Sequence, residues 1–263
     1  MARVILHSDA NSFYASVECL HRPDVRNGPL SVCGDPEMRH GIVLASNQQA
    51  KKQGVKTGMA VWQAKQKCPG LVVVPPDYAL YKHFSHMLRE IYECYSDRVE
   101  SFGLDECWLD LSNPDFSIAD GEQKAHEIRL RVKNALGITV SVGVSNNKIF
   151  AKLGSDMKKP DAVSVIPPDR FQELIWHLPA SDLLYIGPKT MQKLRSCGIL
   201  TIGNLANAPP DMLKSRLGKN GLLLQGYANG WDRSPVKPTT LEEAIGSIGN
   251  SIEKLFAYSF CIP

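Results

Sequence analysis

The sequence predicts an α+β fold in which a small sheet with flanking helices is followed by a helical region. Short apolar runs suited to buried strands occur near the N-terminus and again over 138–144. Apolar residues recur every three or four positions across 78–95, as in an amphipathic helix. The elements follow the order strand, insertion, helix, strand, strand, helix, strand. Apart from the insertion, this is the ferredoxin-like β-α-β-β-α-β arrangement.

The first strand and the insertion make up the N-terminal part. The apolar run Val4–Leu6 reads as a buried strand, and Ser8 and Asp9 follow it, so the strand brings an aspartate to its C-terminal end. The insertion, 13–76, carries mixed signals. Its expected elements are a helix over 13–20, a strand over 42–45 and a helix over 47–53.

The middle of the chain combines two helices with a hairpin. The first helix carries one apolar stripe, formed by Tyr81, Phe84, Leu88, Ile91, Tyr92 and Tyr95. Strands over 98–102 and 107–111 follow, and the short turn between them carries Asp105 and Glu106. A second helix ends at Gly137, and the β-branched strand 138–144 comes next.

The C-terminal part is predicted to be helical. A helix is expected over 146–159, with Ser145 or Asn146 as its N-cap and Pro160 as its stop. Its lysines share one face, which suits phosphate groups; they are Lys148, Lys152 and Lys159. Beyond 167–168, a Gly-containing hairpin at 186–189 separates two helices and is typical of backbone contacts to phosphates.

Composition excludes several classes of protein. With 43% hydrophobic and 22% charged residues the 263-residue chain can bury a core, which excludes disordered and collagen-like proteins. The longest aliphatic run, Leu71–Val74, is far too short to cross a membrane, and no secretory signal opens the chain, so we expect a cytoplasmic protein. Seven cysteines without a Cys-x-x-Cys pair fit neither a disulfide framework nor a zinc ribbon.

Charge is distributed unevenly along the chain. The net charge is only +3, yet residues 148–219 contain eleven Lys or Arg and six Asp or Glu. A polyanion would bind this segment, although a solvated basic face has the same composition.

The predicted topology brings acidic residues together. In a ferredoxin-like sheet the first strand and the hairpin are central neighbours, so Asp9 approaches Asp105 and Glu106. Neighbouring carboxylates stay ionised together only when a cation lies between them. A cluster of oxygen ligands favours Mg²⁺ or Mn²⁺ over zinc.

Three blocks of sequence resemble a known family. They are Ser8–Glu18 (SDANSFYASVE), Leu104–Asp110 (LDECWLD) and Lys148–Pro160 (KIFAKLGSDMKKP). In this order and spacing they strongly resemble the Y-family translesion DNA polymerases of the DinB and UmuC type, over roughly residues 1 to 250. The resemblance implies a palm (1–10 and 77–166), a small fingers insertion (11–76) and an all-α helix-hairpin-helix thumb (167–233). Residues 234–263 would be a linker and the start of a little-finger domain.

The resemblance also implies an activity, which is template-directed transfer of a dNMP to a primer 3′-hydroxyl with low processivity. Asp9 and Asp105 would bridge two Mg²⁺ ions, or Mn²⁺, with help from the carbonyl of Ala10. Glu106 would hold the ion that activates the primer. Two ions are needed because negative charge builds on both the attacking and the leaving oxygen, and each ion stabilises one of them. The implied partners are primer-template DNA, a dNTP and a sliding clamp, with no membrane and a monomeric chain.

Further residues are implied to contact the nucleotide and the DNA. Tyr14 would be the steric gate against a ribose 2′-hydroxyl. The alternative is a purely structural role, as a core aromatic on a helix. The residues implied to bind the triphosphate are Phe13 and Tyr14 through backbone N–H groups, and Gln48, Lys51 and Lys159. The hairpin residues Ile186, Gly187 and Lys189 would contact duplex phosphates.

Several positions depart from the family pattern. Gln48 and Lys51 stand where Tyr and Arg are usual, which weakens the expected grip on the triphosphate because Lys lacks the bidentate fork of Arg. Tyr185 replaces the first glycine of the hairpin, which is expected to alter the turn. The chain ends at Pro263, so a little-finger domain is expected to be missing.

Two other functions compete with the polymerase. A non-catalytic DNA- or protein-binding remnant would use the sheet as a scaffold and the helical domain to bind. A palm-fold nucleotidyl cyclase would share the two-metal chemistry, but the Gly-Gly-rich hairpin usual in such cyclases does not occur here.

Overall fold

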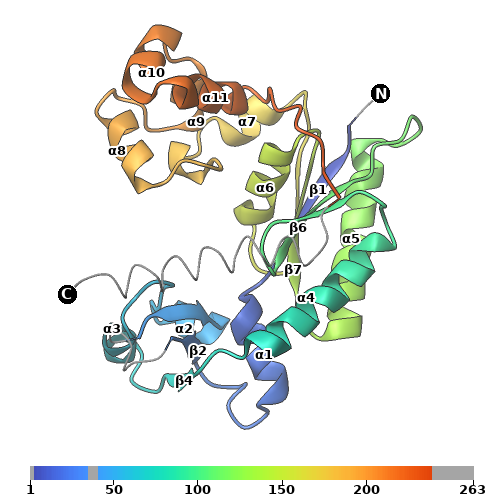
Figure 1. Ribbon diagram of the computed structural model, residues 1–263, viewed down its shortest axis with the longest axis vertical. Helices are drawn as coiled ribbons and strands as arrows, with labels where there is room; N and C mark the ends of the chain where they lie inside the picture. Colours follow the sequence, from blue (N-terminus) through green and yellow to red (C-terminus); the bar gives the residue numbers. More distant parts are fainter. Residues whose placement is uncertain (1–2, 35–40, 239–263) are drawn as a thin grey trace, which may run out of the picture.

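The computed structural model describes residues 3–34 and 41–238, and a five-stranded sheet forms its centre (Figure 1). The strand order is β5-β6-β1-β7-β8. All neighbours are antiparallel except β7 and β8. The strands are β1 (Ile5–Ala10), β5 (Val99–Ser101), β6 (Glu106–Asp110), β7 (Val140–Ser145) and β8 (Val163–Ile166). Every residue of β1 is buried, because both faces of the sheet are covered.

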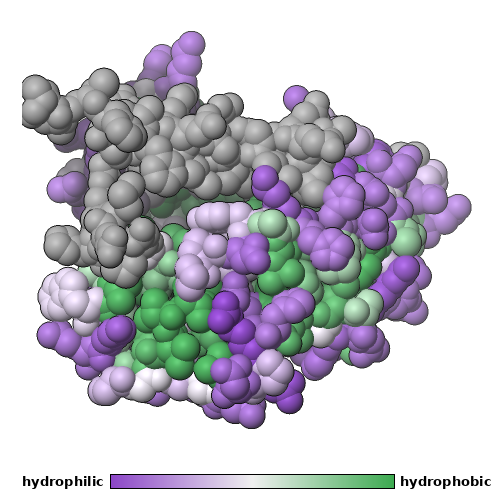
Figure 2. All heavy atoms as spheres, turned by 60° about the horizontal axis from the view of Figure 1, so that its bottom comes forward, coloured by the Kyte–Doolittle hydropathy of each residue, from purple (hydrophilic) through white to green (hydrophobic). Residues whose placement is uncertain are grey.

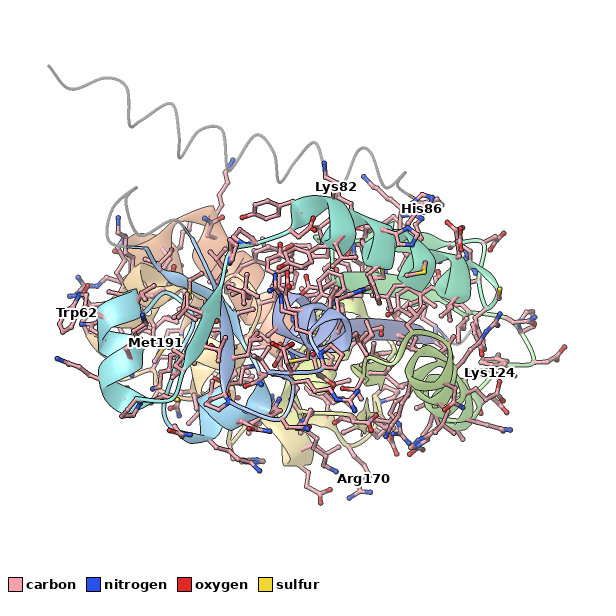
Figure 3. All side chains as sticks on the ribbon, turned by 90° about the horizontal axis from the view of Figure 1, so that it is seen from below. Trp62, Lys82, His86, Lys124, Arg170 and Met191 are labelled. Carbon is pink, nitrogen blue, oxygen red and sulfur yellow. The ribbon has the colours of Figure 1, made fainter. Side chains whose placement is uncertain are left out.

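Two long helices cover one face of this sheet. They are α4 (Tyr78–Glu93) and α5 (Ile118–Leu136). The predicted stripe of α4 is buried as far as Tyr92, and Tyr95 packs beside it beyond the helix end. On the opposite side of α4, His86 is exposed and points outward (Figure 3). Gly137 ends α5 with φ 69°, as predicted.

The ferredoxin-like prediction is confirmed, with one addition. Strand β1, helix α4, the β5–β6 hairpin, α5 and β7 follow in the predicted order, and β6 and β1 are central neighbours. The fifth strand, β8, was not predicted. Its short run Val163–Ile166 pairs in parallel with β7 because α6 supplies the crossover between them.

The other face of the sheet is covered by α6 (Lys148–Met157). Its N-cap is Asn147, whose side chain accepts a hydrogen bond from Phe150 N, so the predicted caps at Ser145 and Asn146 were wrong by one or two residues. Gly143 on β7 lets α6 approach closely, because a Cβ there would lie 1.9 Å from the carbonyl oxygen of Ala151.

The insertion forms a small unit that has a buried cluster of its own and also contributes residues to the main core at the central sheet. Its sheet has the order β3-β2-β4, with β2 (Leu30–Cys33), β3 (Val43–Ser46) and β4 (Val72–Val74). Its helices are α1 (Phe13–His21), α2 (Gln48–Lys52) and α3 (Val61–Lys67). Figure 2 turns this end of the molecule forward and shows hydrophobic residues among hydrophilic ones, and Trp62 on α3 projects into solvent (Figure 3).

Residues 171–228 form a helical unit that shares its core with α6. The helices are α7 (Phe171–Ile175), the 3₁₀ helix η1 (Ala180–Asp182), α8 (Pro188–Arg195), α9 (Ile202–Ala206), α10 (Pro210–Leu217) and α11 (Lys219–Ala228). Ile149, Phe150 and Leu153 of α6 belong to the same buried cluster as the residues of this unit. One face of α6 therefore packs on the sheet and another on the helical unit.

The segment after the helical unit returns to the sheet. Arg3 donates hydrogen bonds to the carbonyl oxygens of Asp232 and Ser234, and Val236 is buried beside Trp108. The helical unit is thus attached to the sheet at both of its ends.

Among the described residues, no helix is long and apolar enough to cross a membrane. The expected start of a little-finger domain lies largely outside the described residues, since these end at 238.

Candidate active site

Strand pairing brings the predicted acids to one end of the central sheet. Asp9 on β1 lies directly opposite Glu106 on β6, so their side chains share one face. Asp105 precedes Glu106, and its carbonyl oxygen accepts a hydrogen bond of 2.9 Å from the backbone N–H of Ala10. The hairpin and the first strand therefore place the three acids as the topology predicts, within one small region.

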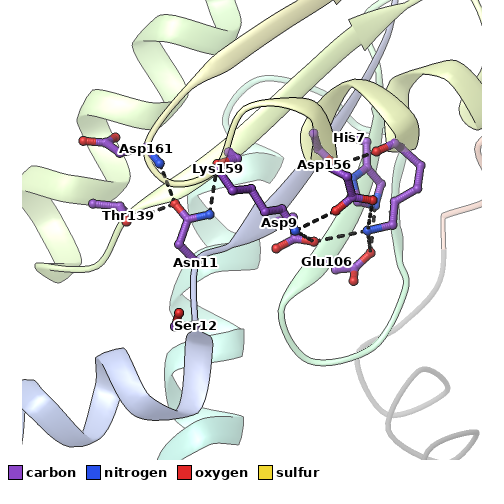
Figure 4. Close-up of polar contacts among 12 residues, drawn as sticks. His7, Asp9, Asn11, Ser12, Glu106, Thr139, Asp156, Lys159 and Asp161 are labelled. Carbon is purple, nitrogen blue, oxygen red and sulfur yellow. Dashed lines mark hydrogen bonds and ion pairs between the residues drawn. The ribbon is translucent and has the colours of Figure 1, made fainter. Parts of the chain in front are cut away.

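Two lysines bridge these acids (Figure 4). Lys159 Nζ lies 2.7 Å from Asp9 Oδ2 and also 2.7 Å from Asp156 Oδ1. Lys152 Nζ lies 3.2 Å from Asp9 Oδ2 and 2.9 Å from Glu106 Oε2. Burial lowers the pKa of each lysine, but the surrounding carboxylates outweigh it and raise both values. Both ammonium groups are therefore charged near neutral pH.

This arrangement corrects one expectation about α6. Its lysines were expected to form an open face for phosphates, yet Lys148 contacts Glu100 at 2.6 Å and lies over the Trp108 ring at 4.4 Å. Lys152 is turned in among the acids. The spacing of residues along a helix predicts which side chains share a face. It does not predict which carboxylates of other elements lie opposite that face, so the sequence did not predict these ion pairs. Lys159, beyond the helix end, is the most exposed of the three.

His7 is a buried partner that sequence reasoning missed. Its Nδ1 lies 2.8 Å from Ser155 Oγ, and its Nε2 lies 3.2 Å from Glu106 Oε2. Burial, the largest effect, lowers the pKa of His7. The signal was its place two residues before Asp9, on the same face of β1.

The acids differ in their electrostatics. Burial, with the charges of Glu106 and Asp9, raises the pKa of Asp105 to about 7. Burial also acts to raise the pKa of Glu106, but its contacts with His7 and Lys152 lower it to about 2. Neighbouring acids whose pKa values are shifted in opposite directions are typical of a functional site.

The donor set fits a hard divalent cation. Within 3–34 and 41–238, no three His, Cys, Asp or Glu side chains already surround a common point, because the lysines hold Asp9 and Glu106. Yet the three acids offer oxygen donors, and Glu106 Oε2 is buried without a well-aligned hydrogen bond to any described residue. The raised pKa of Asp105 indicates a carboxylate that lacks a countercharge.

The predicted gate residue Tyr14 lies beside the acids. Burial, followed by the charge of Asp105, raises its pKa to about 12. Its ring stacks on Tyr81 with centroids 4.2 Å apart and planes 11° apart. The Tyr81 hydroxyl donates a hydrogen bond of 2.7 Å to buried Glu18, and this bond holds the Tyr81 ring of the stack in place. Its neighbour Phe13 is 3% exposed and belongs to the core.

Lys51 joins this region from α2. Its Nζ donates to Ser12 Oγ at 2.8 Å. Burial and then the charge of Lys159 lower its pKa, which shows that the two ammonium groups are near each other. Gln48 begins α2 and, with Asn11 and Ser12, lines a cavity of about 420 Å³.

The hairpin residues have different environments. Ile186 is 6% exposed and packs in the core of the helical unit, so only its backbone can face a ligand. Gly187 is the N-cap of α8, and Lys189 is exposed on the first turn. Tyr185 has φ 70°, so it adopts the left-handed conformation that a glycine would take, and the turn is kept.

Comparison with known proteins identifies the family. The model of the impB/mucB/samB family matches residues 8–156. DNA polymerase IV of Acetivibrio thermocellus is 59% identical over 252 residues, which cover 96% of this chain and 63% of that protein. DNA polymerase IV 1 of Bacillus subtilis is 40% identical over 95% of this chain and 60% of its own length. The chain thus spans about three fifths of these relatives.

Solved structures agree. DinB from Sulfolobus solfataricus superposes with a TM-score of 0.81 at 29% identity, over 89% of this chain and 69% of that one. An insertion ternary complex of Dbh DNA polymerase gives a TM-score of 0.83 at 30% identity, with the same coverage of both chains. The strand-end acids, the bridging lysines and these matches lead to one conclusion: the chain belongs to the impB/mucB/samB family, the Y-family of DNA polymerases.

Proposed function

We propose that this chain is the core of a translesion DNA polymerase, which transfers a dNMP from a dNTP to a primer 3′-hydroxyl under the direction of a template. The observation that carries the proposal is the register of β1 and β6, which sets Asp9 opposite Glu106 with Asp105 beside them. The five-stranded sheet would be the palm (1–10 and 77–166), the insertion the fingers (11–76) and the helical unit the thumb (167–233). Primer-template DNA and a dNTP are the partners.

The acids would hold two divalent ions, Mg²⁺ or Mn²⁺, with the Ala10 carbonyl as a further ligand. Bound there, such ions supply Lewis-acid stabilisation of the attacking and leaving oxygens. The chain itself contributes position and charge. Asp9 and Glu106 are fixed by the β1–β6 pairing, and His7 packs against Glu106 from the interior of the sheet. No side chain need act as a nucleophile, since the primer hydroxyl attacks.

Cationic side chains would bind the triphosphate. Lys159 and Lys51 approach each other beside Asp9, and together they can neutralise phosphate oxygens. Both are lysines, so each acts as a point charge rather than as a bidentate clamp. Gln48 and the backbone N–H groups of Phe13 and Tyr14 complete the proposed nucleotide site, and the Tyr14 ring would exclude a ribose 2′-hydroxyl.

Primer extension tests the proposal. We expect wild type to extend a primer with Mg²⁺ or Mn²⁺ at low salt, and Asp105→Asn to lose at least about a hundredfold in rate. Asp97→Asn is the matched control, because Asp97 is almost fully exposed and lies away from the acids. Equal extension by Asp105→Asn and wild type would contradict the proposal.

One observation favours a second candidate, a non-catalytic DNA-binding protein. Lys152 and Lys159 already neutralise Asp9 and Glu106, so the acids are stable without metal. Titration with Mn²⁺, followed by electron paramagnetic resonance, separates the two functions. Binding that is lost in Asp105→Asn supports the polymerase, and absence of binding in wild type supports the alternative. A sliding clamp as a partner, a monomeric state and a cytoplasmic location remain proposals.

A further inference from the structure

A buried asparagine lies where β1 ends, between Asp9 and the first turn of the insertion. Asn11 follows β1 directly, stands two residues after Asp9 and is only 5% exposed. The oxygen and the nitrogen of its side-chain amide are both hydrogen-bonded (Figure 4). A buried amide with partners on both atoms has a fixed orientation and can hold other segments in place.

The side chain of Asn11 holds the segment that follows α6. Asn11 Oδ1 accepts hydrogen bonds from the backbone N–H of Asp161 at 2.8 Å and from Thr139 Oγ1 at 3.0 Å. Asn11 Nδ2 donates to Ser141 Oγ at 2.9 Å. Thr139 and Ser141 lie at the start of β7. The amide therefore ties Asp161 to the adjoining ends of two central strands.

Asp161 controls where Lys159 lies. Its carboxylate is held on the other side by α5, with Arg129 Nη1 at 2.7 Å and Lys133 Nζ at 2.9 Å. Lys159 is two residues earlier, and its Nζ lies 2.7 Å from Asp9 Oδ2. Two residues of chain span at most about 7 Å, so a shift of Asp161 moves the backbone of Lys159 with it.

The main chain of Asn11 leads to the second lysine. The Asn11 N–H donates to the carbonyl oxygen of Thr139 at 2.8 Å, and the Asn11 carbonyl accepts from Ser16 Oγ at 2.6 Å. The next residue, Ser12, therefore starts from a fixed point, and its Oγ accepts a hydrogen bond of 2.8 Å from Lys51 Nζ. Asn11 is thus linked to one lysine by its side chain and to the other by its main chain.

Two lysines need such a support more than a lysine and an arginine would. Each ammonium group is a point charge on a flexible stem and cannot orient a phosphate by a bidentate contact. Like charges also repel each other at short range. Lys51 and Lys159 can therefore bind one triphosphate together only if their backbones are kept at a fixed separation.

We infer that Asn11 is a positioning residue, which holds Lys159 at the distance from Lys51 at which both contact the triphosphate of one incoming nucleotide. The inference rests on the proposed function and deepens its nucleotide site. Asp9 is held independently by the pairing of β1 with β6. Loss of the Asn11 amide should therefore weaken nucleotide binding while it changes the rate at saturation little.

Single-nucleotide primer extension by the full chain, with the dNTP concentration varied, tests the inference. We expect Asn11→Ala to raise KM for the correct dNTP about tenfold and to change kcat less than about threefold. Asn11→Asp should keep KM within about threefold of wild type, because a carboxylate retains both acceptor contacts and the Ser141 hydroxyl can turn to donate. Ser141→Ala removes only the partner of Nδ2 and should raise KM about threefold, which provides a milder variant if Asn11→Ala does not fold.

A matched control and a double variant separate positioning from a general loss of stability. Asn229 Nδ2, in the helical unit, donates to two backbone carbonyl oxygens, and Asn229→Ala should change KM less than about twofold. Alanine at position 11 keeps the main chain that leads to Ser12, so its effect should depend on Lys159. Added to Lys159→Ala, Asn11→Ala should raise KM by less than about a further twofold.

The reactivity of Lys159 gives a readout that needs no catalysis. In the metal-free protein Lys159 is held by Asp9 and Asp156. Acetylation by N-hydroxysulfosuccinimide acetate, mapped by mass spectrometry, should become at least about threefold faster at Lys159 in Asn11→Ala. The exposed Lys189 of the helical unit should react at the wild-type rate.

These measurements distinguish failure of the inference from failure of the proposed function. The inference is overturned if Asn11→Ala has the KM and the Lys159 reactivity of wild type, if kcat falls instead of KM rising, if Asn229→Ala raises KM as much, or if the effects of Asn11→Ala and Lys159→Ala multiply. Extension that still requires Asp105 would then keep the polymerase. Faster acetylation of Lys159 in Asn11→Ala, without any extension by wild type, would support the positioning and refute the polymerase.

Discussion

Replacing Asp105 by Asn should stabilise the metal-free protein while abolishing its proposed activity. Asp105 has a pKa of about 7 in the fold against an ordinary value of 3.8. Burial and the charges of Glu106 and Asp9 cause the increase, so ionising Asp105 costs more in the folded than in the unfolded state. Asn has nearly the same shape but never ionises, and it avoids this cost.

The magnitude follows from the two pKa values. Each pH unit between them corresponds to about 1.4 kcal/mol, so the full difference is about 4 kcal/mol. Asp105 is partly exposed, and solvent screening reduces this value, so we expect a gain of about 2 to 4 kcal/mol at pH 8. The stability that protonated Asp105 contributes is complete below about pH 4 and is lost as pH rises to about 7. At pH 5 the advantage of Asn should therefore be less than half of that at pH 8.

Urea unfolding with EDTA at pH 5 and pH 8 measures both values. Adding Mg²⁺ at pH 8 should stabilise wild type more than Asp105→Asn, because only wild type has an Asp105 carboxylate that gains a countercharge. The electrostatic argument would be refuted if Asp105→Asn were less stable than wild type at pH 8. It would also be refuted if the gain in free energy of unfolding were the same at both pH values.

Three further predictions concern the fold and the gate. Gly143→Ala should lower the free energy of unfolding by about 3 kcal/mol or more, because its Cβ would meet the α6 backbone; Gly70→Ala, with open space around it, should change it by less than about 1 kcal/mol in urea unfolding. Tyr81→Phe should cost about 1 to 3 kcal/mol in the same assay, since it leaves buried Glu18 without one partner. Tyr14→Ala should raise the ratio of rNTP to dNTP incorporation at least about tenfold in single-nucleotide primer extension, and an unchanged ratio would contradict a gate at this position.

Much of the fold could be predicted because its signals are local. The stripe of α4, the Gly137 helix end and the β5–β6 hairpin depend on spacing and turn residues, and each was placed to within a few residues. The extra strand β8 could not be predicted, because four residues of weak alternation become a strand only beside β7. The N-cap of α6 was misplaced because three successive polar residues, Ser145, Asn146 and Asn147, are all good caps.

The candidate site was predictable in its acids and not in their partners. Topology alone put Asp9 beside Glu106, since the strand order fixes neighbours and register fixes the shared face. The positions of Lys152 and His7 depend on how α6 packs against the sheet, a long-range contact that no local pattern contains. Tyr81 looked like one more apolar residue of α4, and only the fold reveals that its hydroxyl meets Glu18.

The double packing of α6 has a mechanical consequence. At Gly143 the backbone of α6 lies close against β7, while Phe150 on the other face of the helix is buried among residues of the helical unit. A rotation of the helical unit would therefore either disrupt the buried core that it shares with α6 or move α6 with it. Because Lys152 stands on α6, such a movement would alter the distances among the acids at the sheet end.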